Sequence, residues 1–375
     1  MTASRRQRDT RPAMGSRASV LVDASALGGP SASSGIRTMT RGLLGGLVAE
    51  GSFDITAIVT PGVHLPSGVK RREVHRVAPR GRAELVEHAL RLPFELRRTS
   101  TQVFHEPGFH APWRVDRPYV QTLFDVIPLV LDDPDLAALR RRWRRFAPRY
   151  RRADAVIAIS RSAADDGIRL LGLDPARIEI AHLGVGLDFH PGPTTADVPY
   201  LLVVSDFSRR KGFAEAFEVV ARLADLGYPH RLKVAGRVDP WARRDLDSTI
   251  AATRRPDLIE HLGFVDDLPA LVRSASLFLS TSRYEGFGLP ALEAMASGVP
   301  VVAFANSAVT EVVGDGGCLV ADGDVGAMAR AGHRLLSSPA AWDEAREAGL
   351  ARAAGFTWAA AAAVHAEVFA SVAGR

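Results

Sequence analysis

Short apolar runs alternate with helical stretches along almost the whole chain. In the first half the runs are 19–23, 55–60, 102–105, 120–124 and 155–160. In the second half they are 200–205, 231–235, 277–280, 299–303 and 317–320, and helices are expected near 213–226, 243–253, 268–274 and 290–297. Strands that alternate with helices are typical of a parallel sheet covered on both faces.

A segment rich in proline, 188–199, separates the two sets of strands and is expected to be a linker. We therefore predict two doubly wound α/β domains, 18–190 and 191–358. Ligands of such sheets bind beyond the carboxyl ends of the strands, so we expect a site in the cleft between the domains. The last helix, 359–375, is open to packing back on the first domain. Residues 1–17 are polar and rich in arginine and are expected to be a disordered tail.

The composition excludes several classes of site and favours anionic partners. The single cysteine, Cys318, excludes a disulfide framework, a cysteine-based zinc site and an iron–sulfur cluster, and it suits a reducing cytoplasm. No stretch is apolar for long enough to predict a spanning helix, and no secretory signal is expected. The formal charge of +5 favours anionic partners such as phosphates, acidic membrane surfaces or nucleic acid, without choosing among them.

The most informative segment is 280–302. Its loop contains Gly286 and Gly288 and leads to a proline suited to the first turn of a helix. Free amides at such a helix start, together with the positive end of the helix dipole, favour an anion. Two carboxylates, Glu285 and Glu293, lie on either side of this turn.

The two carboxylates have plainer interpretations when taken singly. Glu285 could be a solvated loop charge, and Glu293 could compensate the helix dipole. Their spacing also does not exclude the acid and nucleophile of a glycosidase. An anion site between them suits a diphosphate better than a neutral polysaccharide.

This segment resembles the Glu-x7-Glu signature of the family-4 retaining glycosyltransferases, which have the GT-B fold. The resemblance runs from about residue 19 to residue 360. Further matching segments are 35–37, 122–129, 153–160, 204–212, 261–269, 311–320 and 356–358. The resemblance implies two Rossmann-like α/β domains that face a central cleft.

The resemblance also implies roles for particular residues. Glu285 would contact the transferred sugar near the reacting carbon, and Lys211 and Arg210 would neutralise the diphosphate. Asp125 is a candidate on the acceptor side, with a structural role at the strand end as the alternative. Glu293 would hold the ribose hydroxyls. The other residues implied in donor binding are Gly35, Arg209, Phe264, Val265, Gly286, Phe287, Gly288 and Leu289.

Two positions depart from the family pattern. Asp206 stands where relatives often carry an arginine, and Arg209 is a candidate substitute. Phe124 stands where relatives usually carry a histidine. These departures keep open a non-catalytic protein that binds a partner glycosyltransferase or a glycan. A nucleotide-sugar epimerase is a third hypothesis, although it would not be expected to keep the signature.

The first hypothesis is a metal-independent hexosyltransferase that acts with retention of configuration. Its donor would be a nucleoside diphosphate sugar such as GDP-mannose or a UDP-hexose, and no other cofactor is implied. In the family the reaction is thought to occur on one face of the sugar, with the leaving phosphate helping to deprotonate the acceptor. The acceptor would be a glycan, a lipid-linked molecule or a small molecule. We expect a cytoplasmic protein, with peripheral contact at an acidic inner membrane face left open.

Three further patterns receive structural interpretations. Asp133 and Asp135 match the Asp-x-Asp motif that binds metal in other proteins, but the proline turn in which they lie favours a helix cap. His105 is expected to be structural. The arginine-rich stretch 136–152 is expected to be a core helix with a basic face, interrupted at Pro148, rather than a membrane-surface helix. No motif that reads nucleic acid accompanies its charge.

Overall fold

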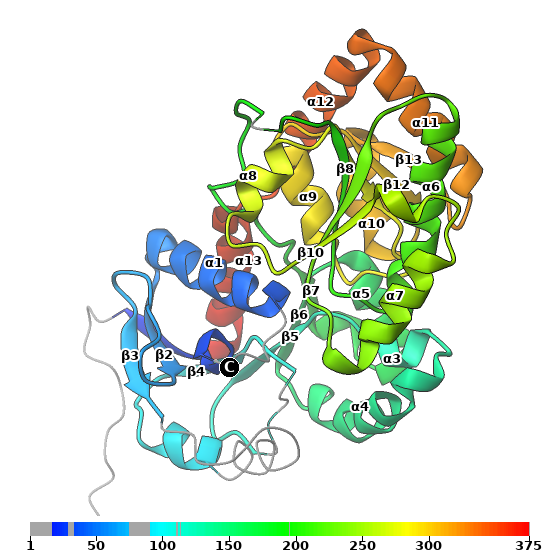
Figure 1. Ribbon diagram of the computed structural model, residues 1–375. Coiled ribbons are helices and arrows are strands. Elements are labelled where there is room, and N and C mark those ends of the chain that lie inside the picture. Colours follow the sequence, from blue (N-terminus) through cyan, green and yellow to red (C-terminus); the bar gives the residue numbers. More distant parts are fainter. Residues whose placement is uncertain are drawn as a thin grey trace, which may run out of the picture.

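The computed structural model describes residues 17–28, 34–74, 91–109, 112, 114–194 and 196–374. The predicted tail, 1–17, therefore lies outside the described residues except for Arg17. The described chain forms two lobes, each built around a parallel sheet (Figure 1). The fold class predicted from the sequence is confirmed.

The first sheet has the strand order β3-β2-β1-β4-β5-β6-β7, and all its pairings are parallel. Its strands are β1 (Ala18–Asp23), β2 (Phe53–Val59), β3 (Lys70–Glu73), β4 (Val103–Glu106), β5 (Tyr119–Leu123), β6 (Ala155–Ala158) and β7 (Ile178–Ile180). Its helices include α1 (Ser34–Glu50), α3 (Ile127–Val130), α4 (Ala137–Tyr150) and α5 (Arg161–Asp166). Val20, Leu21 and Val22 of β1 are fully buried, because helices cover both faces of a central parallel strand.

The second sheet has the order β10-β9-β8-β11-β12-β13 and is also parallel. Its strands are β8 (Tyr200–Val204), β9 (Arg231–Ala235), β10 (Ile259–Gly263), β11 (Leu277–Ser280), β12 (Val301–Ala305) and β13 (Cys318–Ala321). The helices are α6 (Phe213–Asp225), α7 (Arg243–Ala251), α8 (Leu268–Arg273), α9 (Leu289–Ala296), α10 (Ser307–Val313), α11 (Val325–Ser337) and α12 (Pro339–Ala353). The strand order reverses between the neighbours β8 and β11, and ligands bind at such a switch point.

Three strands of the structure, β3, β7 and β10, were not predicted from the sequence. Each lies at an edge of its sheet. β3 reads Lys-Arg-Arg-Glu and has no fully buried residue. An edge strand has one unpaired side and little cover, so no apolar run is required.

The last helix, α13 (Trp358–Ala373), leaves the second lobe and packs along α1 of the first (Figure 1). The close approach depends on two glycines of α1. A Cβ atom at Gly42 would lie 2.1 Å from the Trp358 ring, and one at Gly46 would lie 2.5 Å from the Trp358 carbonyl oxygen. Further along α13, the ring of Phe369 packs edge to face against the ring of Phe53, with the ring centres 5.8 Å apart.

One helical stretch in the described chain, Pro339–Ala373, is long and apolar enough to cross a membrane by length and composition alone. This stretch is the pair α12 and α13, with a break between them. The apolar side of α13 is already occupied in packing, because Ala362, Phe369 and Val372 are buried in the protein.

Helix α4 buries its apolar side, including Trp143, Phe146 and Tyr150, against the first sheet. Pro148 lies inside α4 and does not interrupt it, contrary to the prediction. The proline is exposed and lies in the last turn, so the hydrogen bond it cannot donate is lost where water is available. His105 is fully buried and bonds the Thr122 hydroxyl at 2.9 Å, which fits the structural role expected for it.

Candidate functional site

A small open pocket lies where β8 and β11 end and α9 begins. Its walls come from both strand ends, from the two loops that follow them and from the first turn of α9. The lining residues are Val203, Val204, Ser205, Lys211, Phe278, Leu279, Ser280, Thr281, Ser282, Glu285, Gly288, Pro290 and Ala291. The pocket therefore lies at the switch point of the second sheet and uses the glycine loop and helix start singled out in the sequence.

Two cations meet one carboxylate at the pocket. The Lys211 Nζ atom lies 2.5 Å from Glu285 Oε1, and the Arg210 guanidinium lies 3.7 Å from Glu285 Oε2. The side chains of Lys211 and Glu285 are only 11% and 18% exposed, so water screens this pair weakly. The structure thus brings together Lys211, Arg210 and Glu285.

Backbone contacts fix the cation loop against the carboxylate loop. Gly212 adopts a left-handed conformation with φ of +64°, and a Cβ atom there would lie 2.1 Å from the Thr281 carbonyl oxygen. The Thr281 hydroxyl donates to the Lys211 carbonyl at 2.9 Å, and the Arg283 amide donates to the Arg210 carbonyl at 2.8 Å. Glycine at 212 is therefore required for the loop to approach so closely.

The backbone of Glu285 is held from its other side by the start of α10. The Glu285 amide donates to the Ser307 hydroxyl at 2.9 Å, and the Ala308 amide donates to the Glu285 carbonyl at 3.4 Å. Ser307 has a φ of 40°, a left-handed conformation that costs about 1–3 kcal/mol for a residue other than glycine. Ser307 was not predicted as part of the site, because a strained backbone leaves no mark in a pattern of residue types.

The charges at the pocket perturb one another. Burial opposes ionisation of Glu285, but Lys211 and Arg210 outweigh it and hold the pKa of this carboxyl below its ordinary value. Burial lowers the pKa of the Lys211 amine, and Arg210 adds to this effect, although Glu285 acts in the opposite direction. The cluster is therefore a compact group of charges that is largely removed from water.

Glu293 lies in α9, one turn after Pro290 and so on the same side of the helix. Its side chain is buried, and burial raises its pKa to about 8. Among the residues that the structure describes, none forms a hydrogen bond or ion pair with this carboxyl. A buried acid without a partner is unfavourable unless a ligand supplies one.

The first lobe reaches the site through Phe124 and Asp125, which follow β5. A Cβ atom at Gly286 would lie 2.5 Å from the Phe124 carbonyl oxygen, so the glycine loop touches this strand end directly. Asp125 accepts a hydrogen bond from the Ile127 amide at 3.0 Å, and burial raises the pKa of its carboxyl. Asp125 thus has the structural bond that was expected as one alternative, and it also lies beside the glycine loop, because a Cβ atom at Gly286 would lie 3.0 Å from the Asp125 Cβ atom.

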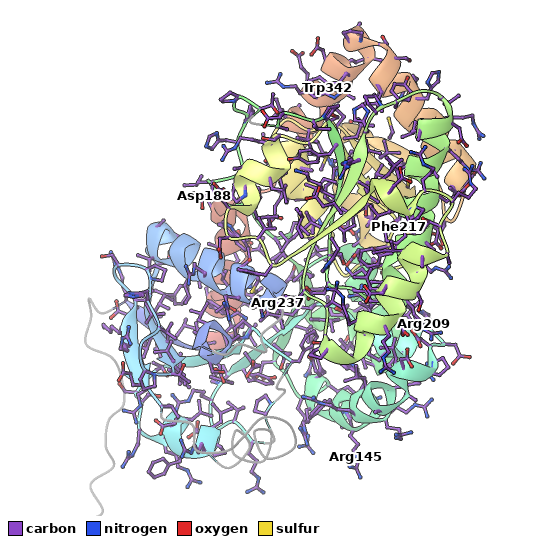
Figure 2. The ribbon with its side chains drawn as sticks, viewed as in Figure 1. Arg145, Asp188, Arg209, Phe217, Arg237 and Trp342 are labelled. Carbon is purple, nitrogen blue, oxygen red and sulfur yellow. The ribbon has the colours of Figure 1, made fainter. Side chains whose placement is uncertain are left out.

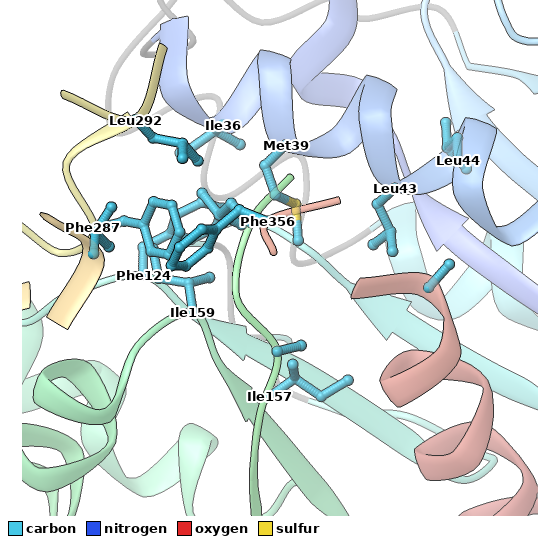
Figure 3. Packing of buried hydrophobic residues seen from close by; sticks show 14 of the residues in the cluster. Ile36, Met39, Leu43, Leu44, Phe124, Ile157, Ile159, Phe287, Leu292 and Phe356 are labelled. Atoms are coloured by element: carbon cyan, nitrogen blue, oxygen red, sulfur yellow. The ribbon is translucent and has the colours of Figure 1, made fainter. Parts of the chain in front are cut away.

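A second contact from the first lobe orients the same loop. The Ser160 hydroxyl donates to the Gly286 carbonyl at 2.8 Å and accepts from the Ala163 amide as the cap of α5. Phe287 turns inward and packs against Phe356, with the two ring centres 5.9 Å apart, beside Phe124 (Figure 3). Phe287 therefore offers only its backbone to a ligand, because its side chain belongs to the core that joins the lobes.

Glu311 of α10 forms a further link between the lobes. Its carboxylate accepts from the Arg161 amide at 2.9 Å, at the start of α5, and bonds His182 Nε2 at 2.6 Å. A carboxylate at a helix start satisfies free amides and complements the dipole. The sequence matched the segment of Glu311 to the family, but the partners, 150 and 129 residues away, were beyond local patterns.

Several predicted binding residues lie apart from this cluster. Arg209 is 76% exposed and pairs with Asp135 at 3.6 Å, where the second lobe meets the helices of the first (Figure 2). It is therefore not a third cation of the pocket. Asp206 accepts from the Arg237 amide at 3.1 Å, so it stabilises a neighbouring loop. Asp133 caps the turn before α4 by accepting from the Asp135 amide.

Four other predicted residues, Phe264, Val265, Gly35 and Leu289, are not among those that line the pocket. Phe264 follows β10, is 64% exposed, and has the Arg237 guanidinium 4.9 Å from its ring centre. Val265 packs partly against the core. Gly35 is in the first turn of α1, where no atom of the described residues lies within 4 Å of an added Cβ, and Leu289 begins α9.

Comparisons with known proteins agree with this architecture. The family described as Glycosyltransferase Family 4 matches residues 33–189, and Glycosyl transferases group 1 matches residues 198–338. O-antigen chain mannosyltransferase B of Escherichia coli is 30% identical over 292 residues, which are 72% of this chain and 74% of that protein. MMP alpha-(1->4)-mannosyltransferase of Mycolicibacterium hassiacum is 32% identical over 54% of this chain and 51% of its own length.

Solved structures of low sequence identity share the fold. Sucrose-phosphate synthase from Thermosynechococcus elongatus has a TM-score of 0.79 at 20% identity, covering 95% of this chain and 99% of its own. Anabaena HepE in complex with UDP and glucose has a TM-score of 0.72 at 17% identity, covering 95% and 100%. With the family matches and the paired parallel sheets, this leads to one conclusion: the chain belongs to glycosyltransferase family 4 and has the GT-B fold.

Proposed function

We propose that the protein moves a hexose from a nucleoside diphosphate sugar to an acceptor hydroxyl with retention of configuration. The observation that carries this proposal is the position of Lys211 and Arg210 beside the pocket in which α9 begins. Side-chain cations and a helix start both attract an anion, and a diphosphate is one. The mannosyltransferases among the relatives support a hexose as the transferred group.

Glu293 would hold the nucleotide through its ribose. Two neighbouring ribose hydroxyls can both donate to one carboxylate, and this buried carboxyl has no partner among the described residues. Glu285 would accept a hydroxyl of the transferred sugar, on the side of the pocket that faces Asp125. Phe264 would lie toward the base.

The cations would act mainly on the transition state. The leaving diphosphate gains negative charge as the sugar–phosphate bond breaks, and fixed positive groups stabilise that charge without reorganising. An interaction that strengthens in the transition state raises turnover, whereas one that is equal in both states only tightens binding. With two cations and a helix start on the diphosphate, the proposed reaction needs no metal ion. Retention would follow if the acceptor attacks on the face that the diphosphate leaves and gives its proton to that phosphate.

The test is the turnover of Lys211→Ala in donor hydrolysis and transfer assays. We expect a loss of about 100-fold or more, the usual effect of removing one preorganised charge stabiliser. Lys70→Ala is the matched control, because Lys70 pairs with Asp54 on the exposed edge strand β3 and should leave turnover unchanged. Near wild-type turnover in both Lys211→Ala and Arg210→Ala would contradict the proposal and favour a non-catalytic binding protein.

A further inference from the structure

The two cations of the proposed diphosphate site already share one carboxylate in the protein as it stands. Glu285 contacts Lys211 at 2.5 Å and lies 3.7 Å from Arg210, so one carboxylate lies between both positive groups. We propose that Glu285 is an internal substitute for the diphosphate, and that it weakens the hold on the nucleoside diphosphate product relative to the nucleotide sugar. This inference rests on the proposed function of the pocket.

A diphosphate that enters the pocket must compete with this carboxylate. If Glu285 turns away, its ion pair with Lys211 is lost. If it stays, two like charges share a site that is largely removed from water, and their repulsion is weakly screened. Both routes oppose binding of the anion, so the conclusion does not depend on which one the side chain takes.

The geometry confines this competition to the side chain. Ser307 and Ala308 bond the amide and carbonyl groups of Glu285, and Gly286 is fixed through Ser160. The backbone at 285 is therefore held while the carboxylate remains 18% exposed at the pocket wall. Only rotation about side-chain bonds is needed for the carboxylate to leave the cations.

The nucleotide sugar and the nucleoside diphosphate product differ in the hydrogen bonds that they can donate to Glu285. The nucleotide sugar brings sugar hydroxyls, which can donate hydrogen bonds to the displaced carboxylate. After transfer the sugar is gone, and the product has no group that replaces those bonds. The carboxylate then has its best partners in Lys211 and Arg210 again, so its return favours release of the diphosphate.

The test uses inorganic pyrophosphate, UDP and GDP as probes, with affinity measured by calorimetry on the full chain. In Glu285→Gln we expect pyrophosphate, and the nucleoside diphosphate that binds, to be held about tenfold more tightly than in wild type. Glu285→Asp keeps the charge and should not show this gain. Glu215→Gln is the control for loss of a nearby charge, because Glu215 pairs with Arg283 at 2.7 Å rather than with the two cations.

The outcomes separate this inference from the proposed function. Equal or weaker binding of pyrophosphate and nucleotide by a Glu285→Gln protein with a wild-type melting temperature would overturn the inference alone. Tighter pyrophosphate binding with no nucleotide binding in either protein would support competition between Glu285 and a diphosphate, but it would overturn the donor assignment and with it the effect on nucleotide release. If neither protein binds pyrophosphate, UDP or GDP, both the inference and the proposed function are overturned. An equal gain in Glu215→Gln would assign the effect to net charge and overturn the role of Glu285.

Discussion

Replacement of Glu293 by glutamine should have opposite effects on stability and on nucleotide binding. Burial raises the pKa of this carboxyl from 4.5 to about 8, and no described residue compensates it. Burial of Glu293 therefore lowers the stability of the folded protein at every pH at which the carboxyl of the unfolded chain is ionised. In the proposed complex, ribose hydroxyls supply the missing partners, so the same residue that weakens the free protein strengthens binding.

The magnitude follows from the two pKa values. Between about 4.5 and about 8 the folded protein holds more protons than the unfolded chain, so stability falls as the pH rises through this window. At roughly 1.4 kcal/mol per pH unit, the wild type loses about 3 to 4 kcal/mol between about pH 5 and about pH 8 through this group alone. Glutamine does not titrate, so Glu293→Gln should lack this loss.

Denaturant unfolding of wild type and Glu293→Gln across this pH range measures the effect. The difference between the two free energies of unfolding isolates position 293, because the other titrating groups are shared. The variant should gain on the wild type as the pH rises, and the control Glu215→Gln should not reproduce that gain. A difference that stays flat with pH would refute the argument from burial. Above about pH 8, where the carboxyl of the wild type is ionised, the variant should also bind nucleoside diphosphates about 1.5–3 kcal/mol more weakly, the value of a hydrogen bond to a charged group.

Three further predictions concern the metal, the return of α13 and the link between the lobes. Transfer should survive EDTA, and a loss that manganese or magnesium restores would contradict the assignment of the diphosphate charge to side chains. Gly46→Val should destabilise the protein by about 1–3 kcal/mol or more in thermal unfolding, because the added atoms meet the Trp358 backbone; a wild-type melting temperature would contradict this packing. Glu311→Ala should cost about 1–2 kcal/mol by removing the acceptor for the first amides of α5, and Glu311→Gln, which keeps one accepting oxygen, should cost less; equal costs would argue against the hydrogen bonds and for the charge alone.

The sequence allowed the sheets and the position of the pocket to be predicted because both depend on local patterns. Apolar runs indicate central strands, and the glycines and proline around Gly286 predict a helix start without any knowledge of tertiary contacts. The partners of the site were not predictable in this way. Lys211 and Glu285 are 74 residues apart and meet only because β8 and β11 are neighbours. Arg209, next to the two cations in sequence, instead pairs with Asp135 of the other lobe.

Burial was the other quantity that the sequence left open. Glu293 is one of many acidic residues in the chain, and its residue type does not reveal that it is buried with no partner among the described residues. The edge strand β3 consists of Lys-Arg-Arg-Glu and has no apolar pattern, so it forms because β2 offers free backbone groups rather than because of its side chains.

The return of α13 to the first lobe has a consequence for synthesis of the protein. A nascent chain leaves the ribosome from its N-terminus, and domains usually fold as they appear. Here the glycine side of α1 and the ring of Phe53 stay uncovered until the helix that follows Trp358 has been made. The lobe that is translated first is thus completed last. A nonsense mutation or truncation that removes the last helix would damage the first lobe while leaving both sheets intact in sequence.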